Sequence, residues 1–407
     1  MAWFYRGRSD VCVMRIYLSI LSLAWVPMLA WSVVFGWVSH DQASAASHQA
    51  QGMAVGRLRV GVVLPFTGSQ ADYGQEVYTG MQIAMTQIRA KDADMGHKIE
   101  LVKANDRSSV SGVDLAVSEL DKRRVQIYVG SVTEINSQQL VKLAAEKQKP
   151  VIVPVATTVS LKDVYTNAFM ANYPRAWQGR LLAKWVSTSR PQSRVGVIYD
   201  AQSPFASRLV EQFVQGLGVS AAQLVFKEDV PVKERKYGEL ASLLVERQAG
   251  VLLYPSEDVD DVRRMLAEID KKKASVQLLG VDAWGEPAFA QKVGGRTQQM
   301  SYLLPFSYRN EADPEVRWFT SEFVARLKRY PSAIAYLGYD SMMMAYSAFK
   351  QANSERSSEL KRVLHTLREV PGLLGAFTVG VRSPFPEKAA MVVSLGPRGV
   401  SWNKVTP

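Results

Sequence analysis

Cysteine and histidine are almost absent from this chain. Cys12 is its only cysteine and precedes a long apolar tract, so no disulfide can form within the chain. None of the four histidines has a partner at metal-ligand spacing, which makes ordinary polar roles the expectation for them. The sequence also lacks a G-x-S-x-G nucleophile elbow, a Walker loop and a G-x-G-x-x-G fingerprint. These absences predict a protein that is not an enzyme and that uses no metal or cofactor.

The composition is that of an ordinary globular protein. Its 407 residues can form two domains with separate cores, and 47% of them are hydrophobic while 21% are charged. The net charge of +11 raises nucleic acid as a partner. The basic residues, as in Arg263-Arg264 and Lys271-Lys272-Lys273, lie among acidic ones on predicted helix faces, which is typical of a solvated surface. We therefore expect no nucleic-acid partner.

Residues 1–46 have the pattern of an export segment. Arg6, Arg8 and Arg15 precede an apolar tract from Ile16 to Val38, and the small residues Ala43-Ser44-Ala45 follow it. This order is typical of a secretory signal with its cleavage site. The tract is also long enough to span a membrane, so a retained anchor stays open, and it would be the only membrane contact. In both cases the arginines favour a cytoplasmic N-terminus and a periplasmic body.

From Arg57 onward, apolar strands alternate with amphipathic helices. Such alternation with short connections predicts an α/β fold with doubly wound parallel sheets, covered by helices on both faces. The predicted strands cover residues 58–64, 99–103, 126–129, 151–153, 194–199, 223–227, 250–254 and 276–279. The predicted helices cover residues 73–90, 112–122, 137–147, 175–189, 204–217, 237–247 and 259–272.

The alternation forms two series, which predicts two lobes. After Met300 the order changes to three helices at 313–330, 334–351 and 357–368, followed by strand-like pieces at 376–381 and 389–394. A tail of this kind is better explained as completing both lobes than as a third domain. We predict a first lobe of residues 57–172 completed by about 304–372, and a second of 173–303 completed by about 373–407. The chain then crosses between the lobes more than once, which makes a hinge and a cleft.

Polar loops follow the predicted strands of the first series at their carboxyl ends, where open α/β sheets hold ligands. Gly130–Ser137 follows the third strand and Pro154–Thr158 the fourth. Hydroxyl groups and free N–H groups at a helix N-terminus favour a carboxylate or another anion. Plain helix capping by Thr133 and Thr158 explains the same residues, so both interpretations stay open.

The second series carries acidic and aromatic residues at the same places. Its strand ends are followed by Asp200–Phe205, Tyr254–Asp258 (which includes Glu257) and Gly280–Trp284. An acid beside an aromatic ring suits a cation such as an ammonium group. A packing role for Trp284 and a turn-forming role for Asp282 are equally consistent with the pattern.

Together, these segments resemble the periplasmic solute-binding proteins of the leucine/isoleucine/valine type, which have the type I binding fold. The resemblance covers Arg57 to about Ser394. Each segment alone is weak evidence, but their order and spacing are specific for the fold. The segments are VGVVLPFTGSQADYGQEVYTGMQIA, YVGSVTEINSQQL, KPVIVPVATT, RVGVIYD, LLGVDAW, LGYDSMMMAYSAF and VPGLLGAFTVG.

The resemblance implies two α/β lobes, joined by three crossovers, that close on a small-molecule ligand and deliver it to an ABC-type membrane permease. It also implies site residues. Thr157 would hold the ligand carboxylate, with backbone contacts at Val155 and Ala156 beside it. Phe205 would supply an aromatic contact and Asp282 the acid that binds an ammonium group.

Two positions depart from the family pattern, and a third lines the site. Glu134 stands where the family carries a hydroxyl residue, although Thr133 or Ser137 can substitute if the loop shifts. A buried glutamate there would repel a ligand carboxylate or have to stay protonated. Phe205 lacks the hydroxyl of the usual tyrosine, and Tyr73 is expected at the crevice wall. A cationic, amide-like or less polar ligand therefore stays open beside an amino acid.

The sequence as a whole predicts the exported substrate-binding component of an ABC importer for a small polar solute. The main alternative is a membrane-anchored sensing or regulatory protein with the same fold, held by the tract Ile16–Val38. An exported enzyme and an assembly factor with an empty cleft are less consistent with the pattern and also stay open.

Overall fold

The computed structural model describes residues 56–157, 167–218, 223–285, 289, 292–293, 299–310, 312–379, 385–396 and 399–406. The predicted export segment, with Cys12 and the cleavage motif, lies outside the described residues, as does Thr158. Within the described part of the chain, no helix is both long and apolar enough to cross a membrane.

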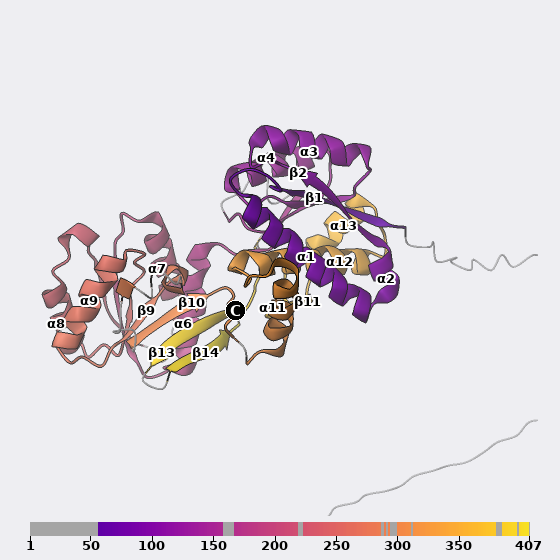
Figure 1. Cartoon of the computed structure of the whole chain (residues 1–407). Coiled ribbons are helices and arrows are strands. Elements are labelled where there is room, and N and C mark those ends of the chain that lie inside the picture. Colours follow the sequence, from indigo (N-terminus) through magenta and orange to yellow (C-terminus); the bar gives the residue numbers. More distant parts are fainter. Residues whose placement is uncertain are drawn as a thin grey trace, which may run out of the picture. The chain divides into compact units, whose positions relative to one another are not determined.

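The first lobe contains a five-stranded parallel sheet. Its strands are β1 (Leu58–Leu64), β2 (Ile99–Asn105), β3 (Ile127–Gly130), β4 (Val151–Val153) and β5 (Ala168–Met170). Its helices are α1 (Ala71–Lys91), α2 (Ala93–His97), α3 (Val110–Lys122), α4 (Glu134–Glu146), α11 (Pro314–Leu327), α12 (Ala333–Ala352) and α13 (Ser357–Leu364). The strand order is β2-β1-β3-β4-β5, which puts β1 between β2 and β3. Figure 1 shows α3 and α4 on one face of this sheet and α1 and α12 on the other.

Two apolar cores form on the two faces of this sheet, because successive side chains of a strand point to opposite faces. Val60 and Val62 pack with α1 and α12, whereas Val63 packs with α3 and α4. Two glycines bring α1 and α12 together. A Cβ on Gly80 would lie 2.0 Å from the Ala335 carbonyl oxygen, and a Cβ on Gly338 2.0 Å from that of Val77. Only glycine allows the two helices to approach this closely.

The second lobe contains a seven-stranded sheet with the order β14-β13-β10-β9-β8-β6-β7. Its strands are β6 (Arg194–Tyr199), β7 (Gln223–Asp229), β8 (Val251–Leu253), β9 (Gln277–Gly280), β10 (Met300–Leu304), β13 (Ala390–Gly396) and β14 (Gly399–Val405). Its helices are η1 (Arg175–Trp177), α6 (Gln178–Ser189), α7 (Pro204–Leu217), η2 (Val232–Glu234), α8 (Tyr237–Glu246), α9 (Val259–Lys271) and η3 (Asp282–Gly285). Neighbouring strands are parallel except that β13 pairs antiparallel with β10 and β14.

The predicted α/β class with two doubly wound lobes is confirmed, and most predicted elements are present. Four strands were not predicted: β5, β10, β11 (Val370–Gly372) and the edge strand β14, which is mostly exposed and has no apolar pattern. The helix predicted from Ser137 begins at Glu134 instead, because Thr133 caps its first turn. The helix predicted from Arg175 begins with the 3-10 turn η1 before α6.

The tail contributes to both lobes. Its hairpin of β11 (Val370–Gly372) and β12 (Gly375–Phe377) packs in the first core, together with Leu373 and Val379, whereas β13 belongs to the second sheet. The predicted division at residues 372 and 373 stays a prediction. The buried ammonium group of Lys388 lies just before β13, forms an ion pair with Asp340 of α12, and donates to the Ala171 carbonyl oxygen at 3.0 Å. This pair fixes the tail against α12 and the segment after β5.

Candidate functional site

The loop after β3 ends in a capped helix. The Thr133 hydroxyl accepts a hydrogen bond from the Asn136 N–H at 3.4 Å, and its side chain is half-buried. Glu134 is the first residue of α4 and is exposed, not buried as the departure from the family pattern suggested. A carboxylate at a helix N-terminus is favoured by the helix dipole. Glu134 therefore has a structural reason for its position without facing a ligand, and it puts a negative charge at the rim of the first lobe.

A second polar cluster at the same sheet edge was not predicted. Asp106 and Ser131 follow β2 and β3, and both are fully buried. The Ser131 hydroxyl donates to Asp106 Oδ2 at 2.5 Å, and the Ser108 N–H donates to Oδ1 at 2.9 Å. Burial raises the pKa of Asp106, although these hydrogen bonds oppose the rise. The signal for this cluster was available, because Asp106 lies at the carboxyl end of a predicted strand.

The loop after β4 carries three predicted residues with different surroundings. Ala156 is buried in the core beneath α3 and α4. The Val155 carbonyl oxygen, expected to face the ligand, accepts a hydrogen bond from Asn172 Nδ2 at 3.1 Å. Thr157 is half-buried. Tyr73, in the first turn of α1, is 47% exposed. Among the predicted residues of this lobe, Thr157 and Tyr73 thus have partly accessible side chains.

In the second lobe, the structure brings Phe205, Glu257 and Asp282 together around one residue that sequence reasoning missed, Arg175. Arg175 Nε donates to Asp282 Oδ2 at 3.1 Å, and Nη2 donates to Oδ1 at 2.5 Å. Nη2 also donates to Glu257 Oε1 at 2.6 Å, and the guanidinium carbon lies 4.3 Å from the centre of the Phe205 ring. The predicted acidic and aromatic side chains therefore surround a cation that belongs to the protein itself.

Trp284 packs beneath this cluster. Its side chain is only 1% exposed, stacks on Phe289 with ring centres 5.8 Å apart, and donates its indole N–H to the Ser256 carbonyl oxygen at 2.7 Å. Of the two interpretations left open by the sequence, the packing role accounts for this geometry. Trp284 therefore holds the backbone next to Glu257.

A buried ionic network supports the same loop. The guanidinium of Arg235 pairs with Asp261, and both side chains are at most 2% exposed. The Tyr254 hydroxyl accepts from Arg235 at 2.9 Å and donates to Asp261 at 2.7 Å, while the Tyr237 hydroxyl also donates to Asp261 at 2.9 Å. Burial and the Asp261 charge raise the pKa of Tyr254, so its hydroxyl stays protonated. The network fixes the strand end that leads to Glu257.

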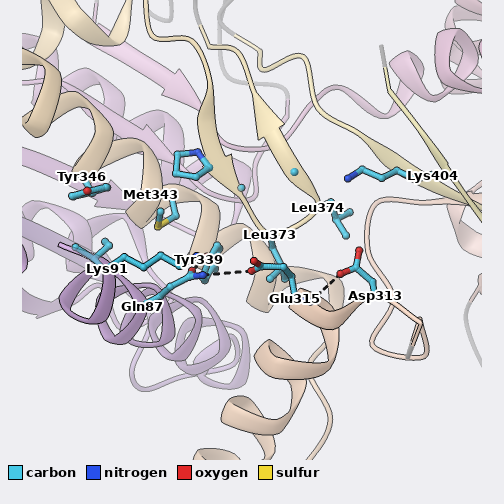
Figure 2. Close-up of a pocket in the computed structure, with 14 residues that line it drawn as sticks. Gln87, Lys91, Asp313, Glu315, Tyr339, Met343, Tyr346, Leu373, Leu374 and Lys404 are labelled. Carbon is cyan, nitrogen blue, oxygen red and sulfur yellow. Dashed lines mark hydrogen bonds between the residues drawn. The ribbon is translucent and has the colours of Figure 1, made fainter.

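A cavity of about 280 Å³ lies elsewhere, between α1, the start of α11, α12, the β11–β12 hairpin and Lys404 of β14. Figure 2 shows Lys404 extending toward the hairpin residue Leu374, while Gln87, Glu315 and Tyr339 lie together. Gln87 Nε2 donates to Glu315 at 3.4 Å, and the side-chain carbonyl oxygen of Gln87 accepts from the Tyr339 hydroxyl. The three polar side chains therefore satisfy one another. None of the predicted site residues lines this cavity.

No catalytic or metal-binding constellation is present in the described residues. They contain no group of three or more histidine, cysteine, aspartate and glutamate side chains that could hold a metal ion. His97 ends α2, and the ring of His365 packs edge-on against Phe169 at 4.9 Å. The fold and the strand-end loops define a two-lobed α/β protein with polar groups at the strand ends of both sheets.

The comparison with protein families agrees with this class. The family model described as periplasmic binding protein matches residues 57–393. The chain therefore belongs to the periplasmic binding protein family, whose members of this fold are solute-binding proteins and not enzymes.

Relatives and solved structures place the fold more closely. The chain is 20% identical over 317 residues to the leucine-specific-binding protein of Salmonella typhimurium, which covers 77% of this chain and 85% of the relative. The structure resembles that of a branched-chain amino acid transporter substrate-binding protein from Streptococcus pneumoniae in complex with isoleucine, with a TM-score of 0.57, 20% identity, and coverage of 86% of this chain and 100% of that one. It also resembles a solute-binding protein of an ABC transporter from R. palustris in complex with benzoate, with a TM-score of 0.52, 16% identity, and coverage of 86% and 97%. The resemblance to the leucine/isoleucine/valine type is thereby confirmed.

Proposed function

We propose that the chain is the exported, periplasmic substrate-binding component of an ABC-type importer. It captures a small polar solute, an amino acid or an amide-like compound, in a cleft between its lobes and delivers it to a membrane permease. The observation that carries the proposal is the family match across both lobes, combined with polar loops at the strand ends of each sheet. The isoleucine and benzoate complexes of proteins with this fold support a small carboxylate-bearing ligand.

The proposed binding site has two halves. Thr157, Thr133, the backbone of Val155 and Ala156, and the Glu134 loop contact one end of the ligand, with Tyr73 at the wall. The cluster around Phe205, Glu257 and Asp282 forms the other half of the site, and Trp284 supports it. A ligand that touches both halves stabilises the closed state by its differential affinity for that state.

The test is ligand-dependent thermal shift of two site variants. The ligand is first identified by native mass spectrometry of the protein purified from its own periplasm. We expect Thr157→Ala to weaken binding about 2-fold to 10-fold, as loss of a neutral hydrogen bond does, and Asp282→Ala to weaken it more because the cluster loses its anchor. Thr86→Ala, at an exposed helical threonine that bonds only Gln82 and Arg326 in the described structure, is the matched control. Wild-type responses from both site variants would show that the site assignment is wrong.

The apolar tract Ile16–Val38 favours a second candidate function, a membrane-anchored sensing protein with the same fold. N-terminal sequencing of the native protein separates the two functions. A mature start near Ala46 supports the transport receptor, whereas an intact N-terminus supports the anchored sensor.

A further inference from the structure

Arg175 joins three separate segments of the second lobe into one rigid unit. It pairs with Asp282 of η3 through two parallel hydrogen bonds, with Glu257 after β8 through a third, and stacks over Phe205 of α7. A planar guanidinium held by a bidentate carboxylate and an aromatic face has little remaining freedom. All four residues belong to the same lobe, so the unit does not depend on how the lobes close.

Asp282 uses most of its acceptor capacity within the protein, since three hydrogen bonds converge on a carboxylate that offers about four acceptor sites. Its Oδ2 accepts from Arg175 Nε, and its Oδ1 accepts from Arg175 Nη2 and from the Ala283 N–H at 3.0 Å. A ligand ammonium group would compete for this carboxylate with a guanidinium that is already paired in its best geometry. The side chain is also only 23% exposed. Asp282 is therefore a positioning residue for Arg175 rather than a direct acceptor for the ligand.

Arg175 itself still has donors to offer. Its side chain is 41% exposed, and its Nη1 donates no hydrogen bond to any described residue. Burial opposes its charge, but the hydrogen bonds and the attraction from Asp282 and Glu257 raise its pKa above the ordinary value. The guanidinium thus stays charged in any solution in which the protein is folded.

The charges of the cluster decide what kind of group it attracts. One guanidinium and two carboxylates leave a net negative charge, so the cluster attracts no anion over long distances. At hydrogen-bond distance the free Nη1 edge dominates, since Asp282 and Oε1 of Glu257 face the other donors of Arg175, and Glu257 is 48% exposed and screened by water. An oxygen acceptor meets donors there, whereas an ammonium group meets a like charge.

We propose that Arg175 is the ligand-selecting contact of the second lobe, and that it selects a solute presenting a carboxylate or amide oxygen at that end and no ammonium group. This inference rests on the proposed solute-binding function. It names the ligand as an organic acid or amide without an α-amino group.

The experiment compares ligands that differ only in the amino group, using isothermal titration of the whole chain. The pairs are leucine with 4-methylpentanoate and phenylalanine with 3-phenylpropanoate, and the corresponding amides without the amino group complete the panel. We expect the member without the amino group to bind about 10-fold to 100-fold more tightly, as the gain or loss of a charge-assisted hydrogen bond does. The Arg175→Gln variant should abolish this preference.

Three further variants separate selection from folding. Arg175→Lys keeps the positive charge but loses the planar set of guanidinium donors, so it should retain only part of the preference. Arg263→Gln is the control at an exposed arginine paired with Asp260, and it should leave the preference unchanged. Asp282→Asn should reduce the preference because it loosens Arg175. Circular dichroism and the thermal midpoint without ligand establish that each variant is folded.

The possible outcomes are distinct. Tighter binding of the amino acids, or an unchanged preference in Arg175→Gln, overturns the inference while the solute-binding function stands. If no acid, amide or amino acid of the panel binds, the inference is contradicted, whereas the proposed function is tested separately by the solute that native mass spectrometry identifies.

Discussion

The two lobes share one sheet plan but present different chemistry at their strand ends. In the first lobe the buried carboxylate of Asp106 accepts hydrogen bonds from the Ser131 hydroxyl and the Ser108 N–H, and the partly accessible side chains are Thr157 and Tyr73. In the second lobe Arg175 is partly exposed and held by Asp282 and Glu257. The first lobe thus offers neutral contacts beside the exposed Glu134 carboxylate, which has no fixed partner among the described residues, while the second lobe offers a positive charge oriented by two carboxylates. We therefore expect ligand selection by charge to be a property of the second lobe.

The largest expected effect is a loss of stability in the second lobe, caused by removing the ionic network that supports its half-site. Arg235→Met leaves the Asp261 carboxylate buried at 1% exposure with no counter-charge. We expect a loss of about 3–5 kcal/mol in the free energy of unfolding, measured by urea denaturation, because an uncompensated buried charge is costly. Arg235→Met combined with Asp261→Leu should recover most of the loss. A single-variant loss below about 1 kcal/mol would contradict this account of the network.

The helix-capping residues Thr133 and Ser203 allow a matched comparison of the two half-sites, because each one accepts a single capping hydrogen bond. Thr133 caps α4 by accepting from the Asn136 N–H at 3.4 Å, and Ser203 caps α7 by accepting from the Ala206 N–H at 3.3 Å. Thr133→Ala and Ser203→Ala should each lower the free energy of unfolding by about 1 kcal/mol, measured by urea denaturation. If Thr133 also contacts the ligand, only its variant will bind the identified ligand more weakly at equal stability. Equal affinities would restrict Thr133 to capping.

The smallest expected effect is a pH dependence in the first lobe. The pKa of Asp106 is raised above its ordinary value of 3.8 in the folded protein. As the pH rises from 3.8 through the folded pKa, the folded state holds more protons than the unfolded state, so this group lowers stability with rising pH. Asp106→Asn removes the titration.

Urea denaturation of both proteins across this pH range measures the effect. Relative to wild type, Asp106→Asn should gain about 1 kcal/mol or less toward neutral pH. The hydrogen bond lost in the variant is the same at each pH and drops out of the slope. Asp114→Asn, at an exposed aspartate, is the control. A difference that does not change with pH would show that Asp106 ionises in the folded protein as it does in the unfolded chain.

Much of the fold followed from local patterns. Strands such as Leu58–Leu64, Val151–Val153 and Arg194–Tyr199 have the predicted bounds, because each is an apolar run that ends in a polar loop. The edge strand β14 was not predicted, because its burial is too low to leave a pattern in the sequence. The first turn of α4 was missed for a different reason: Glu134 and Ile135 are both exposed and carry no helical apolar period.

The sequence predicted only part of the candidate site. The rule that ligands lie at the carboxyl ends of strands led to Phe205, Glu257 and Asp282, and the structure brings these three together. It could not predict their partner, since Arg175 lies 107 residues from Asp282 along the chain. The packing role of Trp284 could not be predicted for a similar reason, because its indole N–H bonds to Ser256 in another loop, 28 residues away along the chain.

Local residue patterns were sufficient for the alternation of strands and helices, the two lobes and the lack of catalytic motifs, since these depend on residue types at short spacing. Which charges meet depended on the tertiary structure instead. An acid and an aromatic in sequence indicate a cation site, but whether that cation belongs to the ligand or to the protein depends on contacts between distant segments. Here the cation is Arg175, because the start of the second lobe folds against the ends of β8 and β9.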